Sequence, residues 1–298
     1  MTSHGSAATP ALTVAAVARR LRVAPATLRT WDRRYGLGPS EHSEGEHRRY
    51  SESDLAKLIH MRKLVISGVA PADAAAAALK FKGKIDLQVF ADLPEPDQGI
   101  ISMLHKAVHA LDRNLSEQII RSEFKVNGIA ATWCNVLTPV LVIVGEEWAT
   151  TGVGIEVEHM LSEIIHRLLI ESTEQLKSPV NSRPVLLACV GEEIHSLAIT
   201  ALAACLAEDQ IQVQFLGART PQSAINEVVR RVGPPAIFLW AQLSKNGDPA
   251  IIQELPKLRP APRVILGGPG WNPDRCKSAN FVDDLTAARR EISRAVGV

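Results

Sequence analysis

The stretch that decides the N-terminal fold is LTVAAVARRLRVAPATLRTWDRRYGLGPSEHSEGEHRRYSESDL, residues 12–55. Its first apolar residues recur at the helical spacing i, i+3, i+4 and i+7: Val14, Val17, Ala18 and Leu21. This spacing predicts a first helix with one apolar face. Pro25 follows after a short break and is typical of the first position of a second helix, because a missing N–H costs nothing there.

The second helix is expected to be apolar on one side and basic on the other. Leu28, Trp31 and Tyr35 are expected to face the core. The residues expected to point outward are Thr27, Arg29, Arg33 and Arg34. Two short helices, the second of them basic, are what a protein needs to read the major groove of DNA. An amphipathic helical cap with merely solvated arginines is the alternative.

The residues after the second helix predict a wing and then a third helix. Glycine and proline alternate with polar residues and indicate a hairpin or wing that closes on Arg48, Arg49 and Tyr50. Ser51 and Asp54 have the spacing of a capping box, which starts a helix by pairing its first free N–H groups.

This stretch resembles the MerR family of winged helix-turn-helix regulators. The resemblance is carried by TLRTWDRRYGL (27–37), Arg49-Tyr50-Ser51 and Asp54-Leu55. It implies a DNA-binding domain over residues 10–82 and a double-stranded DNA operator as partner. The residues assigned to DNA contact are Thr27, Arg29, Arg33, Arg34, Tyr35, Arg48, Arg49 and Tyr50. Family wings are usually basic, whereas three glutamates lie in this one and are expected to weaken its attraction to phosphate.

Composition is that of an ordinary folded chain with two or three domains. The 298 residues are 46% hydrophobic, with a mean hydropathy of +0.04. Residues 12–66 hold eleven Lys/Arg and six Asp/Glu, a local charge of +5; the whole chain carries +1, so the remainder carries −4. This asymmetry puts the surface that binds a polyanion near the N-terminus.

Neither the cysteines nor the apolar runs point to an exported or membrane protein. The four cysteines are scattered without CxxC spacing, which favours buried thiols in a reducing compartment over disulfides or a zinc site. The apolar run 136–144 is too short to span a bilayer, and residues 1–10 lack the layout of a secretory signal. We therefore expect a cytoplasmic location and no membrane partner.

Two further regions follow, one helical and one alternating. Residues 98–177 have helical periodicity throughout and predict a four-helix bundle. From 184 to 298 short apolar strands alternate with helices, which predicts a doubly wound parallel sheet of the Rossmann-like class. The expected strands are 185–190, 211–216, 236–240 and 263–266. The expected helices are 195–208, 221–232 and 249–258. The fold class is thus multidomain: winged helix-turn-helix, bundle and α/β sheet.

Candidate ligand-binding residues lie in both regions. Ligands of such sheets bind beyond the carboxyl ends of the strands, and the first expected strand ends in a loop that carries Glu193 and His195. The histidine is available to a ligand there, with Glu193 orienting its other ring nitrogen; a helix-capping histidine is the plainer interpretation. In the bundle, Trp148 is followed ten and eleven residues later by Glu158 and His159.

Together these residues resemble the cobalamin-binding regions of the CarH/LitR-type photoreceptor regulators, which are MerR-like at the N-terminus. The resemblance implies that His195 is the lower axial ligand of cobalt, backed by Glu193. Trp148, Glu158 and His159 would wall the opposite face, which carries the adenosyl group. The glycine pair Gly267-Gly268 would lie near the nucleotide tail of adenosylcobalamin. Light would then break the cobalt–carbon bond and dissociate an oligomer (dimer or tetramer) that holds several DNA-binding modules on the operator.

Three positions depart from that pattern. Ala198 replaces the glycine of the His195 loop. Trp240 replaces a serine, and its indole is expected either to fill the slot for the nucleotide tail of the cofactor or to stack on that tail. Ala149 follows Trp148, where light sensors carry a histidine that captures cobalt, so a stabilised photoproduct is not expected.

The leading hypothesis is a transcriptional regulator, not an enzyme, controlled by adenosylcobalamin. Two alternatives stay open: a regulator that keeps the fold without binding cobalamin, and a cobalamin-dependent methyl-transfer carrier. His105 and His109 have the spacing of zinc ligands, but no Cys or carboxylate accompanies them in the sequence, which favours histidines at the edge of the core.

Overall fold

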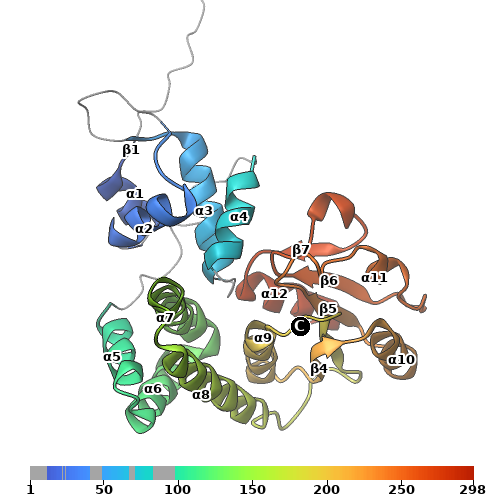
Figure 1. Cartoon of the computed structure of the whole chain (residues 1–298). Helices are drawn as coiled ribbons and strands as arrows, with labels where there is room; N and C mark the ends of the chain where they lie inside the picture. The colour runs from blue at the N-terminus through green and yellow to red at the C-terminus, as the bar shows by residue number, and fades with distance from the viewer. Residues whose placement is uncertain (1–11, 22, 24, 41–48, 67–70, 83–97) are drawn as a thin grey trace, which may run out of the picture. The chain divides into compact units, whose positions relative to one another are not determined.

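The computed structural model describes residues 12–21, 23, 25–40, 49–66, 71–82 and 98–298. The chain divides into two compact units, Met1–Lys63 with Pro71–Glu95, and Leu64–Ala70 with Pro96–Val298. Each unit is considered by itself. Figure 1 labels most of the helices and strands of both units.

The N-terminal unit is a small helical domain with a two-stranded sheet. Its elements are β1 (Leu12–Thr13), α1 (Val14–Leu21), α2 (Pro25–Tyr35), β2 (Arg49–Tyr50), α3 (Glu52–Ile66) and α4 (Pro71–Lys80). The strands are antiparallel, with Leu12 opposite Tyr50. Val17, Leu28 and Trp31 are buried as predicted. The predicted wing hairpin falls largely on residues outside the described part of the chain.

The capping box predicted at the start of α3 is present and has an additional partner. The Asp54 amide donates to Oγ of Ser51 at 3.2 Å, and the Ser51 amide donates to Oδ2 of Asp54 at 3.0 Å. Ser40 adds its amide and hydroxyl to the same carboxylate oxygen. Burial alone raises the pKa of Asp54, but the hydrogen bonds from Ser40 and Ser51 outweigh it and lower that pKa below 3.8.

We expect Asp54→Asn to destabilise the N-terminal unit by about 1–2 kcal/mol, the usual cost of losing a helix cap. Because the pKa is lowered in the folded state, the carboxylate stabilises the fold above pH 3.8, and this stabilisation is lost as the pH falls through the folded-state pKa. Urea unfolding with hydrogen exchange on residues 49–66 measures both effects. Ser53→Ala, at an exposed position of the same turn, is the control. Equal destabilisation at pH 7 and pH 3 would contradict the assignment.

The second unit begins with the predicted four-helix bundle. Its helices are α5 (Gln98–His109), α6 (Arg113–Thr132), α7 (Thr138–Thr151) and α8 (Ile155–Thr173), and the π-helical turn η2 (Trp133–Leu137) joins α6 to α7. One side of α8, which includes Leu161 and Ile164, is buried. Leu111 follows α5 with a φ of 53° and is 51% exposed.

One stretch of the bundle, Arg113–Trp148, is long and apolar enough to cross a membrane by length and composition alone. It is not one straight helix, since Gly128 has a φ of 74° and a ψ of 167°. Trp133 and Leu137 from this stretch lie in the core that the bundle shares with the sheet. We interpret the stretch as core helices.

The rest of the unit is a five-stranded parallel sheet. Its strands are β3 (Val185–Val190), β4 (Val213–Thr220), β5 (Ala236–Trp240), β6 (Arg263–Gly267) and β7 (Asn280–Val282). Their order in the sheet is β4-β3-β5-β6-β7. Connections therefore run in opposite directions from β3 and β5, and the carboxyl ends of these two strands form the switch point where ligands of such sheets bind.

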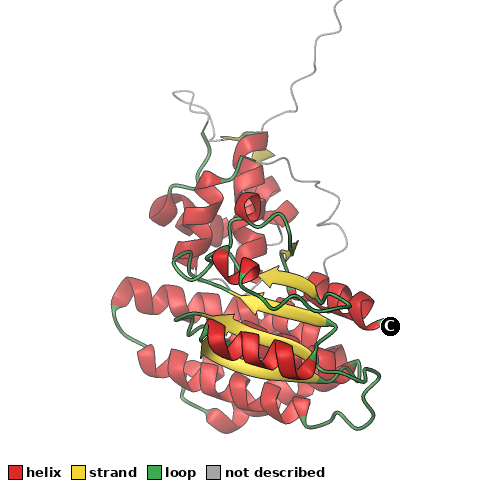
Figure 2. Cartoon of the chain, turned by 90° about the vertical axis from the view of Figure 1, so that its right-hand side faces the viewer, coloured by secondary structure: helices red, strands yellow, loops and turns green. Residues whose placement is uncertain are grey.

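Helices cover both faces of the sheet, as Figures 1 and 2 show. They are α9 (Leu197–Glu208), α10 (Gln222–Val232), α11 (Ala250–Gln253) and α12 (Leu285–Val296). α9 and α12 share one core cluster with the bundle, while residues of α10 and α11 pack on the other face. The Rossmann-like class is thus confirmed.

Several predicted boundaries were wrong. α9 begins at Leu197, two residues after His195, and β4 extends to Thr220 because it pairs with β3 over that length. α11 covers only Ala250–Gln253, since turns follow it where a longer helix was expected. β7 and α12 were not predicted.

The bundle and the sheet are joined through α9. Its residues 199–207 are buried on all sides, and α9 contacts both α8 and α6. At the Gly128 kink the amide of Ile129 donates to Oε1 of Glu208 at 3.1 Å, so the carboxylate at the end of α9 holds the N–H that the kink frees. The predicted domain boundaries 98–177 and 184–298 remain predictions, because the two regions share one core.

Candidate functional site

The predicted ligand residue His195 lies at the switch point of the sheet. It belongs to the loop between β3 and α9, and its side chain is 39% exposed. Oε1 of Glu193 accepts from the His195 amide at 3.0 Å and lies 2.5 Å from Nδ1 of the ring. The predicted orienting role of Glu193 therefore has the geometry it requires.

Glu193 is fully buried and its second oxygen holds the neighbouring loop. Oε2 accepts from the amides of Gln242 and Leu243, at 2.8 and 2.9 Å, and from Nδ2 of Asn246 at 3.0 Å. Burial alone raises the pKa of Glu193, but the hydrogen bonds from His195, Leu243 and Asn246 outweigh it and hold the pKa far below its usual range. The carboxylate is therefore ionised and ties the loops after β3 and β5 together.

The ionised carboxylate fixes which nitrogen of the His195 imidazole carries a proton. A carboxylate is an acceptor only, so Nδ1 of His195 must carry a proton to bond to it. The neutral ring then has its lone pair on Nε2. An imidazole with one nitrogen held by a carboxylate and the other free is the usual arrangement of a metal-ligating histidine.

A recess beside this loop is lined by two of the three residues that depart from the family pattern, Ala198 and Trp240. It is lined by Ala198, Trp240, Gly267 and Gly268 from the sheet domain and by Trp133 from the bundle. Its cavity volume is about 20 Å³, which is room for roughly one water molecule. Trp240 is 4% exposed, and its Nε1 is buried without a hydrogen-bond partner among the described residues. The indole therefore occupies this recess.

Packing within the chain itself explains why positions 267 and 268 are both glycine. A Cβ on Gly267 would lie 2.3 Å from the Phe238 ring, and one on Gly268 would lie 2.3 Å from the carbonyl oxygen of Ala241. Gly268 also has a φ of +96°, which favours glycine. Close packing of β6 against β5 thus explains both glycines, and their predicted contact with a ligand remains a prediction.

The three residues predicted to wall a ligand on the bundle side lie around the turn between α7 and α8. Trp148 is 43% exposed in the last turns of α7. His159 is exposed in the first turns of α8, where its Nδ1 lies 2.9 Å from the carbonyl oxygen of Ile155 and 3.3 Å from Oε2 of Glu158. All three side chains are accessible to a ligand.

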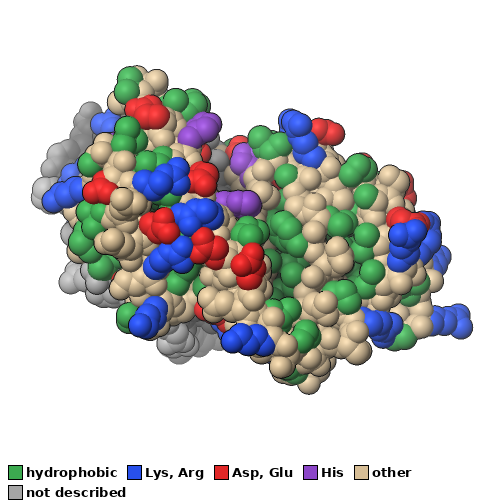
Figure 3. All heavy atoms as spheres, turned by 90° about the horizontal axis from the view of Figure 1, so that it is seen from below, with side chains coloured by type: hydrophobic (Ala, Val, Ile, Leu, Met, Phe, Trp, Pro, Cys, Tyr) green, Lys and Arg blue, Asp and Glu red, His purple; other side chains and the backbone are tan. Residues whose placement is uncertain are grey.

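A separate apolar groove lies where α8 of the bundle meets α9 and β4. Figure 3 shows hydrophobic side chains along a hollow on this side of the molecule, next to a cluster of acidic and basic side chains. The groove is lined by residues of α8, α9 and β4, including Ile170, Ala203 and Phe215, and holds about 220 Å³. An ion pair between Arg167 and Glu117 joins α8 to α6.

In the N-terminal unit the predicted DNA-contacting residues divide into three groups. Arg29, Arg33 and Arg49 are exposed. Arg34 and Tyr35 are half-buried, and the guanidinium of Arg34 lies 5.5 Å from the centre of the Tyr35 ring. Tyr35 is therefore more exposed than expected for the core residue that the sequence predicted.

The third group consists of one predicted residue that is buried and two whose side chains lie outside the described part of the chain. Tyr50 is only 3% exposed, because its position in β2 points inward where that of Arg49 points outward. Its ring belongs to the core, which corrects its predicted place on the DNA surface. Arg48 and the side chain of Thr27 lie outside the described residues.

Sequence reasoning missed two residues of the sheet-edge site. Asn246 follows β5 at an unremarkable loop position, and only the fold brings it to Glu193. Trp133 comes from the bundle and reaches the recess because η2 packs against the sheet. A tryptophan in a helical region carries no sequence signal for such a place.

Comparison with known proteins supports both halves of the sequence analysis. Residues 12–78 match the MerR HTH family regulatory protein model. Residues 100–170 and 183–292 match two models that are both described as B12 binding domain. The chain therefore combines a MerR-type helix-turn-helix region with two consecutive B12 binding domain regions, which confirms the predicted combination.

Two curated relatives match most of this chain over most of their own length. The HTH-type transcriptional repressor CarH of Myxococcus xanthus is 26% identical over 228 residues, which cover 74% of this chain and 75% of the relative. The HTH-type transcriptional repressor CarA of the same organism is 26% identical over 267 residues, 87% of each chain. A solved cobalamin-binding protein from Desulfitobacterium hafniense DCB-2 is 19% identical and covers 66% of this chain and 98% of its own, with a TM-score of 0.33.

Proposed function

We propose that this chain is a cytoplasmic, DNA-binding transcriptional regulator whose second unit binds a corrinoid of the cobalamin class. The observation that carries the proposal is the Glu193–His195 pair at the switch point of the sheet. Its free Nε2 is a preformed nitrogen ligand, and its Nδ1 is held by an ionised carboxylate. Nε2 of His195 would hold a bound corrinoid through its cobalt, and the cofactor would supply a metal centre able to carry a carbon ligand.

The side chains of the bundle support the second half of such a site. Trp148 and His159 are exposed at the α7–α8 turn and would contact the ligand face opposite His195. We propose the adenosyl form of the cofactor because a large exposed indole suits an aromatic group. We propose that a ligand bound between the α7–α8 turn and the sheet edge favours self-association and thereby multivalent binding to an operator.

We propose a light response without a stabilised photoproduct. With alanine at position 149, this chain has no imidazole immediately after Trp148. We therefore propose a dark-state ligand complex that light can destroy but that leaves no stable photoproduct. The proposal is for a regulator rather than an enzyme, since both curated relatives are named as transcriptional repressors.

A second candidate function is favoured by one observation, the occupied recess. Trp240 fills the place where the resemblance puts the nucleotide tail, and the remaining 20 Å³ is far too small for an aromatic base. The part of the site around His195 thus fits a corrinoid. The recess that would hold the nucleotide tail fits one only if the indole of Trp240 moves. A regulator that has kept the fold without the cofactor is the alternative that this supports.

We expect His195→Ala to abolish retention of adenosylcobalamin after desalting, followed by corrinoid absorbance. Glu193→Gln should weaken binding by about 10- to 100-fold, because loss of the partner carboxylate releases the imidazole from its fixed orientation. His166→Ala, at an exposed position of α8, is the control, and circular dichroism verifies the fold. If the wild-type chain retains no corrinoid of any kind, the cofactor-free alternative replaces the proposal.

We expect the wild-type chain to bind a tail-less corrinoid (cobinamide) at least as tightly as cobalamin. Trp240→Ser should shift this preference toward cobalamin by about tenfold or more, since it opens the recess. The same change should cost about 3–5 kcal/mol of stability, as for other large core truncations. Trp271→Ser, buried on the other face of the sheet, should cost as much without changing the preference. Equilibrium dialysis measures both ligands, and an unchanged ratio in Trp240→Ser would refute the role of the indole.

We expect Arg33→Ala to weaken operator binding and to reduce the slope of log K against log salt by about one unit, because each lost phosphate contact releases one counterion fewer. Arg231→Ala, on the exposed face of α10, should leave the slope unchanged. Titrations by fluorescence anisotropy at several salt concentrations give the slopes. Identical slopes for the wild type and Arg33→Ala would remove this residue from the DNA interface.

A further inference from the structure

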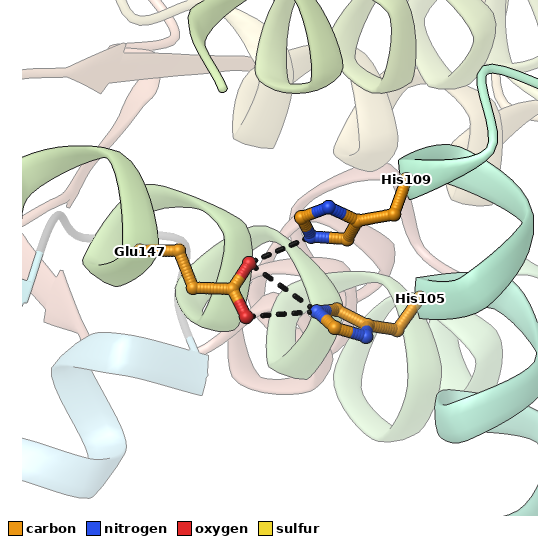
Figure 4. A group of neighbouring side chains, drawn as sticks. All are labelled: His105, His109 and Glu147. Carbon is orange, nitrogen blue, oxygen red and sulfur yellow. Dashed lines mark hydrogen bonds and ion pairs between the residues drawn. The ribbon is translucent and has the colours of Figure 1, made fainter. Parts of the chain in front are cut away.

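Two histidines of α5 and one glutamate of α7 converge at a separate place in the bundle (Figure 4). Nε2 of His105 lies 3.1 Å from Oε1 of Glu147, and Nε2 of His109 lies 2.7 Å from Oε2. The sequence offered no carboxylate beside these histidines, which favoured an ordinary core-edge role. The fold corrects this, because it brings Glu147 from 38 residues further along the chain.

The three side chains have the chemistry and the spacing of an open zinc site. Their ligand atoms all lie within 4.8 Å of one another. Zinc takes nitrogen and carboxylate oxygen at about 2.0–2.2 Å, so tetrahedral ligand atoms stand roughly 3.4 Å apart. The two nitrogen–oxygen contacts, at 3.1 and 2.7 Å, are shorter than this separation, so the side chains would move slightly apart to hold an ion.

The surroundings allow an ion to reach this cluster. The side chains of His105, His109 and Glu147 are 28%, 40% and 42% exposed. Both imidazole rings point the same nitrogen at one carboxylate, and the rings are 4.4 Å apart. A carboxylate accepts a hydrogen bond from each imidazole in the tautomer that carries its proton on Nε2. A zinc ion would bind the other tautomer, in which the same proton lies on Nδ1 and Nε2 offers its lone pair to the metal.

We propose that His105, His109 and Glu147 form a zinc-binding site that links α5 to α7, with a fourth position open to water. The site is distinct from the sheet-edge site of His195 and does not depend on corrinoid binding. Glu147 immediately precedes Trp148, so an occupied site would fix the turn of α7 that presents this indole. Zinc would thereby adjust the bundle side of the proposed ligand site.

The test is zinc binding by the full-length, corrinoid-free chain, measured by competition with a chromophoric chelator. We expect one zinc ion per chain and an increase in Tm on zinc addition. His109→Ala and Glu147→Gln should each weaken binding by about tenfold or more. His166→Ala, an exposed histidine of α8, is the matched control and should bind like the wild type.

Glu147→Gln separates a metal site from a simple polar brace. The amide can still hydrogen-bond both imidazoles, so a brace would leave the Tm without zinc close to that of the wild type. A metal site predicts that the increase in Tm with zinc disappears in this variant. The proposal is overturned if the wild type binds no zinc, or if His109→Ala and Glu147→Gln bind it as tightly as the wild type. Neither outcome bears on the corrinoid assays, which read absorbance at a different site.

Discussion

The buried carboxylate of Glu193 is the interaction on which the sheet-edge site depends. It accepts five hydrogen bonds, from the amide and ring of His195 on one oxygen and from Gln242, Leu243 and Asn246 on the other. A fully buried charge is tolerable only when it is held this completely. The same contacts that stabilise the charge also set the imidazole and join the two loops at the switch point. Stability and ligand geometry are therefore properties of one group.

Local sequence patterns were sufficient to predict most of the elements and to place Glu193 and His195 in one loop. The helical spacing of Val17 and Leu21, the Ser51–Asp54 capping box and the buried strand 236–240 each depend on neighbours along the chain, and each was predicted correctly. Glu193 and His195 were found because both belong to one loop after a strand. By contrast, β7 was missed because it has only three residues and is defined by its pairing with β6. Helix α12 was missed although Leu285, Ala288 and Ile292, which are buried on the sheet, recur at helical spacing.

What the sequence did not reveal are contacts between distant segments. Asn246 reaches Glu193 across 53 positions, and Glu147 reaches the two histidines of α5 across 38 and 42. Tyr50 was misplaced because the alternation of a two-residue strand cannot be oriented without its partner β1. Trp240 was identified as a departure, but only the packing of Trp133 and Phe238 around the recess distinguishes a filled slot from a stacking platform.

The helix α9 is buried along residues 199–207 on every side, between the sheet and helices α6 and α8. A helix that is apolar all round has no face suited to water. The sheet domain expressed without the bundle would therefore expose a wide apolar surface and aggregate, and the bundle expressed alone would lose the Glu208 carboxylate at its kink. Laboratory dissection of this protein should cut before the bundle and keep everything beyond that point as a single folding unit.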